Sequence, residues 1–300
     1  MKPSDANNWQ SAVLDEVFVA LAGDTALTEV LIFKGARILA QIIPEAARQS
    51  LDLDANCTKA FLAQYPDRQQ QAEVLARQLR GAIHRHFEAQ TPVRYQLDSV
   101  QVLPRPPKGH PRGWNALQVQ IRVLDMSRPS VRGLPTLGLD LAYPEALSEH
   151  STTQLEIVGR RVMAYTLERI AGEKLRAFLS TTPAYQQKKA GSRETLRVKD
   201  LPDLAQILKH TPLTDRAFWR QVGAEFRLAC ESRGIDCSGW ATFDAVEEQA
   251  RGFYAKDSTV AGSMAFDDAW KAVKAIVKRM EVEGITPFEF ALPPLIEEQQ

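Results

Sequence analysis

The chain has 300 residues, of which 44% are hydrophobic, and this can supply the core of one large domain or two modest ones. Its 37 lysines and arginines equal its 37 aspartates and glutamates, so no overall field draws the protein to nucleic acid or to an anionic membrane. The N-terminus has no apolar signal core and no run approaches the roughly 18 apolar residues of a membrane span, so we expect a cytoplasmic protein without a membrane partner. Cys57, Cys230 and Cys237 show no CxxC spacing and are expected to be ordinary thiols.

The first segment of the chain combines helices with a short strand. Apolar residues at helical spacing predict a helix over 9–21. The apolar run Val30–Phe33 predicts a short buried strand that enters a turn at Gly35. A second helix follows the turn and ends at Pro44.

The pentapeptide "SLDLD" (50–54) alternates apolar and acidic residues, which is typical of a strand. In a strand, Asp52 and Asp54 project from one face, while Leu51 and Leu53 enter the core. The two carboxylates are therefore expected to lie side by side.

The middle of the chain predicts a meander of strands. A polar helix over 68–87 is followed by strand-like segments at 93–103, 115–126 and 136–143. Loops rich in proline, glycine and arginine join these segments, as hairpin-like connections would be.

Beyond about residue 160 the apolar period becomes 3.6, which predicts a helix over 161–179 and further helices to about 282. The whole pattern predicts an α+β fold, in which a small mixed or antiparallel sheet flanked by helices precedes a mostly helical part. We expect the chain to divide into an α+β domain of residues 1–158 and a helical domain of residues 159–300.

The spacing of Asp52 and Asp54 raises the question of what balances their charge. Alternation of aspartate and leucine on a solvated edge strand would explain them without a site, and this alternative stays open. The preceding strand, glycine turn and helix favour a site, because such a turn presents N–H groups to phosphate oxygens while the aspartates hold bridging divalent cations. Nucleotidyl transfer uses this arrangement with a third carboxylate, for which Asp140 in "LGLDL" is the best candidate and Asp98 and Asp125 are weaker ones.

Several motifs then resemble one family. The segment "KGARIL…RQSLDLD" is similar to the "KGG(T/S)xL…RxSxDLD" signature of the AbiEii/AbiGii-type nucleotidyltransferase toxins, which are DNA-polymerase-β-like transferases of abortive-infection and toxin–antitoxin systems. "YTLERIAGEKLRAFL" and "RVKDLPDLAQIL" resemble two later segments of that family, in the same order. The resemblance covers about residues 10 to 210 and implies that residues 1–158 form a nucleotidyltransferase-like domain.

The resemblance implies a set of site residues and a reaction. It assigns nucleotide binding to Gly35, Ala36, Arg37, Ser50 and Lys174, two Mg²⁺ ions to Asp52, Asp54 and Asp140, and catalytic roles to Asp140, Lys174 and Asp200. It implies transfer of a nucleotide from a nucleoside triphosphate to a tRNA end or a protein hydroxyl, and an antitoxin protein as partner. Lys199 and Asp203 match further positions of the last motif.

The chain departs from the family signature at Ala36 and Arg37, where the family has a second glycine and a hydroxyl residue. Arg37 either supplies a charge-assisted phosphate contact in compensation or is a solvated helix residue. Pro202 also departs, although a first helical turn tolerates proline. Two rival functions follow: a catalytically weakened module that binds nucleic acid or a protein, and a nucleotidyltransferase acting on a small molecule.

Some of these residues also have interpretations without chemistry. A surface ion pair with Glu173 would explain Lys174, and Asp200 and Asp203 would suit the start of a helix.

Two further groups of residues are weaker candidates. His84 and His86 point to different sides of a helix, so they are not expected to form a metal pair. A basic group could contact RNA phosphates or simply be solvated surface. It consists of Arg160, Arg161, Lys188, Lys189, Arg193 and Arg197.

Overall fold

The computed structural model describes residues 3–106, 115–131, 133–143, 145–186, 195–236 and 240–288. Within these residues a seven-stranded mixed sheet has the order β3-β4-β5-β2-β1-β7-β6. The strands are β1 (Leu31–Lys34), β2 (Asp52–Cys57), β3 (Tyr95–Arg105), β4 (Asn115–Asp125), β5 (Leu137–Tyr143), β6 (Thr152–Ile157) and β7 (Arg160–Tyr165). The α+β prediction with a mixed sheet and helices is confirmed.

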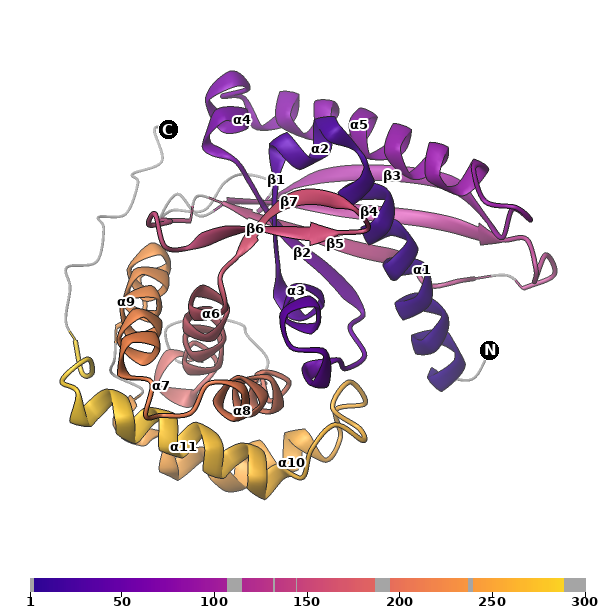
Figure 1. Ribbon diagram of the computed structural model, residues 1–300. Helices are drawn as coiled ribbons and strands as arrows, with labels where there is room; N and C mark the ends of the chain where they lie inside the picture. Colours follow the sequence, from indigo (N-terminus) through magenta and orange to yellow (C-terminus); the bar gives the residue numbers. More distant parts are fainter. Residues whose placement is uncertain are drawn as a thin grey trace, which may run out of the picture.

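Helices cover both faces of the sheet, and Figure 1 shows α4 and α5 on one face and α3, α6, α8 and α9 on the other. The helices are α1 (Pro3–Gly23), α2 (Thr25–Val30), α3 (Gly35–Ile42), α4 (Lys59–Gln64), α5 (Arg68–Glu88), α6 (Leu167–Leu179), α7 (Pro183–Gln186), α8 (Asp200–His210), α9 (Arg216–Arg233), α10 (Glu247–Tyr254) and α11 (Phe266–Val282). Among the described residues, none of them combines the length and apolar character needed to cross a bilayer.

Most predicted elements are confirmed with small shifts. The predicted helices at 9–21 and 68–87 lie within α1 and α5, and the three predicted strands of the meander are β3, β4 and β5, paired antiparallel. Val30 ends α2, so the short strand begins one residue later than predicted. Leu51 precedes β2 and is half-buried, whereas Leu53 enters the core as expected.

The prediction of a helix over 161–179 is wrong in its first part. Residues 160–165 form β7, which pairs antiparallel with β6 across a two-residue turn of Val158 and Gly159. Both turn residues have positive φ, 52° and 71°, and a β-branched residue rarely adopts this conformation. Because Val-Gly occupies the turn in place of Asn-Gly or Asp-Gly, the sequence gives no signal that would have predicted the hairpin.

The helix α6 begins at Leu167 because Thr166 ends the strand and caps the helix. The Thr166 hydroxyl accepts a hydrogen bond from the Arg169 backbone N–H. β7 then pairs parallel with β1 through Phe33 and Ala164, which places the start of α6 beside the start of α3. The division at residue 158 stays a prediction, and the hairpin that straddles it belongs to the sheet.

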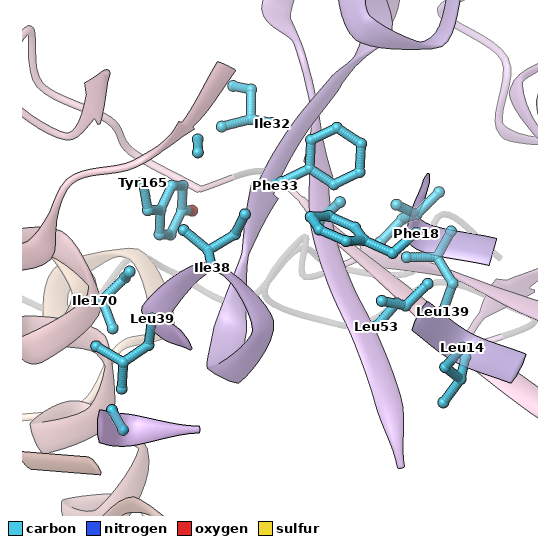
Figure 2. Close-up of a cluster of buried hydrophobic side chains, with 14 of the residues drawn as sticks. Leu14, Phe18, Ile32, Phe33, Ile38, Leu39, Leu53, Leu139, Tyr165 and Ile170 are labelled. Carbon is cyan, nitrogen blue, oxygen red and sulfur yellow. The ribbon is translucent and has the colours of Figure 1, made fainter. Parts of the chain in front are cut away.

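One continuous apolar cluster joins the sheet to the helices. Figure 2 shows part of it, with Phe18 of α1 and Phe33 of β1 on one side of α3 and Ile170 of α6 on the other. The Phe18 and Phe33 rings meet edge to face at 5.4 Å. The amphipathic α3 is thus held by apolar contacts on both sides, and the turn in front of it is held with it.

α6 packs closely on α9 because Gly172 has no side chain. A Cβ atom at Gly172 would lie 2.6 Å from the backbone nitrogen of Phe226 in α9, and backbone atoms cannot move aside cheaply.

Gly172→Ala is expected to lower the free energy of unfolding by about 1–3 kcal/mol, because it overpacks the α6–α9 contact. Gly252→Ala is the matched control: it lies in α10, where an added Cβ meets nothing within 4 Å, so alanine should be neutral or stabilise by up to about 1 kcal/mol. Urea unfolding of both variants measures the difference. Equal stability of the two variants would contradict the packing explanation.

Candidate active site

The turn between β1 and α3 depends on glycine. Gly35 has φ +82°, which disfavours side chains, and an added Cβ would lie 2.4 Å from Oδ2 of Asp54. The aspartate therefore approaches the start of the helix more closely than any other residue type at 35 would permit.

The three predicted metal ligands lie on two neighbouring strands. β2 and β5 run parallel, and Asp54 is in register with Asp140, while Asp52 is in register with Gly138. Side chains two residues apart on a strand share a face, so all three carboxylates face one recess. Ser50 sits in front of β2, where its hydroxyl donates to Oδ1 of Asp52 at 3.0 Å.

The charges of these carboxylates interact. Burial tends to raise the pKa of Asp52, but Lys199, the Ser50 hydroxyl and Arg197 outweigh it and lower this pKa below its ordinary value. Burial and the negative charge of Asp52 raise the pKa of both Asp54 and Asp140. Mutual repulsion of this kind is relieved when a cation binds between carboxylates.

The donor chemistry suits a hard cation, since carboxylate oxygens are the ligands that Mg²⁺ prefers. Within the described residues, however, no group of three or more His, Cys, Asp and Glu side chains is arranged to hold a metal ion. Lys199 Nζ lies 3.4 Å from Oδ2 of Asp52 and is the cation that this carboxylate contacts. A metal ion at Asp52 therefore requires Lys199 to withdraw and the carboxylates to converge.

The recess in front of the three aspartates has an empty volume of about 900 Å³, part of it open to solvent. Its charged lining residues are Lys34, Arg48, Lys174, Arg176, Arg197, Lys199 and Arg233 on the cationic side and Asp52, Asp54, Asp140, Glu145, Glu173 and Asp200 on the anionic side. A chain that is neutral overall thus concentrates charge of both signs in one place.

One buried ion-pair cluster joins α6 and α8 to the segment that leads into β2. Lys174 contacts Asp200 at 3.2 Å and also contacts Asp203, so the surface pair with Glu173 is not what holds it. Arg48 binds Asp203 with two hydrogen bonds of 2.8 and 2.9 Å. Arg197 contacts Asp200 at 2.9 Å, which gives this cluster three cations and two carboxylates.

The ion pairs of this cluster shift the pKa values of Lys174 and Asp200. Burial would lower the pKa of Lys174, but Asp203 and Asp200 outweigh it and raise this pKa. Burial would raise the pKa of Asp200, but Arg197 and Lys174 hold it below its ordinary value. The predicted helix start is confirmed, since Asp200 and Asp203 lie in the first turn of α8 with Pro202 between them.

A second cluster centres on Glu145, whose side chain is 2% exposed. It contacts Lys34 at 3.1 Å and Arg233 at 2.7 Å, and it accepts hydrogen bonds from Asn56 and Tyr165 at 2.8 and 2.6 Å. Burial would raise the pKa of Glu145, but Lys34 and Arg233 hold it well below its ordinary value. The cluster ties the end of β1 to β2, β7 and α9.

Arg37 is buried, so its interpretation as a solvated helix residue is wrong. Its guanidinium donates to Asp15 of α1 and to the backbone carbonyls of Ser11, Ser50 and Asp52. The side chain therefore braces the start of β2 in this structure. A phosphate contact by Arg37 stays a prediction.

The weaker aspartate candidates lie apart from the recess. Asp98 is exposed on β3, and Asp125 is buried, where it accepts hydrogen bonds from the Trp9 indole and the Ser127 hydroxyl. Asp140 is thus the candidate that the structure places beside Asp54.

The remaining candidates are placed as follows. His84 pairs with Glu88 and His86 with Glu16, so the expected separation of the two histidines is confirmed. Cys57 and Cys230 are buried thiols outside any disulfide. Arg160 and Arg161 are exposed on β7, and Arg197 belongs to the buried cluster. Cys237, Lys188, Lys189 and Arg193 lie outside the described residues.

Sequence reasoning missed several lining residues, including Lys34, Arg48, Glu145 and Arg233. Lys34 and Arg48 stand in the quoted motifs "KGARIL" and "RQSLDLD", so the motif itself could have indicated them. Glu145 and Arg233 carry no such signal, since only the fold brings them to the recess.

Comparison with known proteins identifies the family of this chain. A family model described as the nucleotidyl transferase AbiEii toxin of type IV toxin–antitoxin systems matches residues 19–292. The chain belongs to the AbiEii family. No curated protein and no solved structure gave a match. The family is one of nucleotidyltransferase toxins, and the motifs shared with the AbiEii signature lie around the recess.

Loss of Arg48 should destabilise this AbiEii member strongly. Arg48→Ala leaves Asp203 buried with only Lys174 as partner, and breaking a buried pair costs about 3–5 kcal/mol. Lys278→Ala, which removes a solvent-exposed pair with Glu281 on α11, should cost less than about 1 kcal/mol. Denaturant unfolding compares the two variants, and similar losses would contradict the importance of the buried cluster.

Gly35→Ala tests the close approach of Asp54. Gly262→Ala is its control, because Gly262 has a similar φ of +77° but nothing within 4 Å of an added Cβ. Both variants should lose about 1–2 kcal/mol of stability from left-handed strain. Only Gly35→Ala should also lower nucleotidyl transfer, by about 100-fold, because it displaces Asp54, one of the predicted metal ligands. Transfer of label from an α-labelled nucleotide measures this, and equal activity of the two variants would refute the role of the turn.

Proposed function

We propose that this AbiEii member is a metal-dependent enzyme that transfers a nucleoside monophosphate from a nucleoside triphosphate to a hydroxyl group of a tRNA end or a protein, with release of pyrophosphate. One observation carries the proposal: Asp52, Asp54 and Asp140 face one recess from neighbouring strands, directly beside the Gly35 turn. The family supports a nucleotidyltransferase toxin in general terms.

Asp52, Asp54 and Asp140 would hold two Mg²⁺ ions. Magnesium, when bound, neutralises the phosphate oxygens and stabilises the attacking and leaving oxygens. Ser50 orients Asp52 through its hydrogen bond to Oδ1. Asp140 also accepts the proton of the attacking hydroxyl, since it lies beside Asp54 with its side chain open to the recess.

The turn and the helices position the nucleotide. The backbone N–H groups at Gly35 and Ala36, at the start of α3, face phosphate oxygens in the manner of a helix N-terminus. Arg37 holds the backbone of β2 from behind through its bonds to the Ser50 and Asp52 carbonyls. Lys174 and Asp200 belong to a cluster with an excess of cations, which favours a polyphosphate in the recess.

The proposed partners follow from the family. The nucleoside triphosphate and the hydroxyl acceptor meet at the recess, and an antitoxin protein neutralises the toxin in the cytoplasm. The family model names the type IV toxin–antitoxin system and thereby supports an antitoxin partner.

Asp52→Asn tests the proposal, with Asp98→Asn as the matched control on an exposed part of β3. The Asp52 variant should reduce transfer of label from an α-labelled nucleoside triphosphate by at least about 1,000-fold, because it removes a charged ligand of the magnesium ions. The control should keep full activity. Circular dichroism checks that both variants fold, and undiminished transfer by folded Asp52→Asn would refute the proposed function. A wild-type protein that binds no magnesium nucleotide at millimolar concentration would favour the non-catalytic module instead.

A further inference from the structure

Arg176 differs from the other cations of the recess. It lies on α6, is half-buried and lines the recess, and its Nε atom is buried without a hydrogen-bond partner. In the part of the chain that the structure describes, its side chain makes no ion pair and no hydrogen bond. A guanidinium in this position has lost part of its hydration without gaining a partner.

The other six lysines and arginines of the recess each have a carboxylate within 3.4 Å. Each of these cations therefore has a carboxylate partner inside the protein. Partial burial of a cation costs free energy unless an anion compensates it. Arg176 is thus the lining residue whose charge is left for a ligand.

The nearest carboxylate on the same helix does not fill this role. Glu173 lies one turn before Arg176, where an i,i+3 pair would be possible. Glu173 instead contacts Arg169 at 3.1 Å and Lys34 at 3.7 Å, and both of these cations compete for it. The side chain of Arg176 is consequently left directed at the recess rather than at its neighbour.

We propose that Arg176 binds the β- and γ-phosphates of the nucleoside triphosphate, an inference that rests on the proposed function. A guanidinium fork matches two phosphate oxygens and forms strong charge-assisted hydrogen bonds with them. The aspartates and the Gly35 turn serve the α-phosphate from the sheet side, and α6 faces the recess from the helical side. The two sides together can hold the whole polyphosphate chain.

This assignment separates two residues of α6 that the motif treats together. Lys174 is buried and forms ion pairs with Asp200 and Asp203, so its charge already has partners within the protein. Arg176, in contrast, has no carboxylate partner among the described residues. Lys174 is then chiefly a residue that positions α6 against α8, and Arg176 is the specificity residue for triphosphate over monophosphate.

Calorimetry on Arg176→Gln with magnesium and either ATP, ADP or AMP tests the inference. GTP and UTP are included so that the preferred base is found in the same series. Affinity for the preferred triphosphate should fall by about 10- to 100-fold, the range expected for lost hydrogen bonds between charged groups. Affinity for the monophosphate should stay unchanged. Arg176→Lys should retain part of the triphosphate affinity, because it keeps the charge without the fork. Arg77→Gln, at an exposed arginine of α5 outside the recess, is the control and should bind like the wild type.

Three other results would overturn the inference. Unchanged triphosphate binding by Arg176→Gln would show that Arg176 does not bind the triphosphate. A raised Michaelis constant for the acceptor in the same variant would indicate that Arg176 contacts the acceptor instead. An equal loss for triphosphate and monophosphate would indicate general damage to the recess, and thermal unfolding of the variant would show it. A wild-type protein that binds none of the nucleotides would refute the proposed function as well. If the wild type and Arg176→Gln bind the triphosphate with equal affinity, only the inference on Arg176 is refuted.

Discussion

The close approach of the Asp54 side chain to Gly35 is the constraint on which the site depends. Oδ2 of Asp54 occupies space that any side chain at position 35 would need, so strand β2 lies against the start of α3 only because residue 35 is glycine. The antiparallel pairing of Lys34 with Asp54, and the parallel pairing of Asp54 with Asp140, then bring the turn and the third carboxylate to the same place. Three segments that are far apart in sequence thus form one recess through a single central strand.

Buried charge holds the helices to this strand. Arg48 stands four residues before Asp52, and its two hydrogen bonds to Asp203 attach the segment leading into β2 to α8. Glu145 attaches the end of β1 to α9 through Lys34 and Arg233. Such pairs contribute little net stability compared with apolar packing, but removing one partner leaves an uncompensated buried charge. These buried ion pairs therefore fix the positions of the helices relative to the aspartates.

Much of the fold was predictable because it follows local periodicity. α1, α5 and the meander β3–β4–β5 are visible as helical or alternating apolar patterns. The hairpin β6–β7 was not predictable, because Val158 takes a positive φ that its residue type disfavours and so gives no turn signal. In the site, the shared face of Asp52 and Asp54 follows from strand alternation, whereas the hydrogen-bond partners of Arg37 could not be predicted. Its contacts to Asp15 and to the Ser11 carbonyl depend on where α1 packs, and local sequence carries no information on that.

The sequence by itself determined that two aspartates share a strand face behind a glycine turn, because strand alternation and the φ preference of glycine are properties of neighbouring residues. It also determined the family, since the motifs lie in order along the chain. Only the tertiary structure decided which charged side chains form ion pairs inside the protein and which face the recess without a partner. Lys174 and Arg176 are two residues apart on one helix, yet the first meets Asp200 and Asp203 while the second lines the recess without a carboxylate partner among the described residues. Long-range packing of α8 against α6 makes that distinction, because a charge is balanced by whatever lies next to it in space.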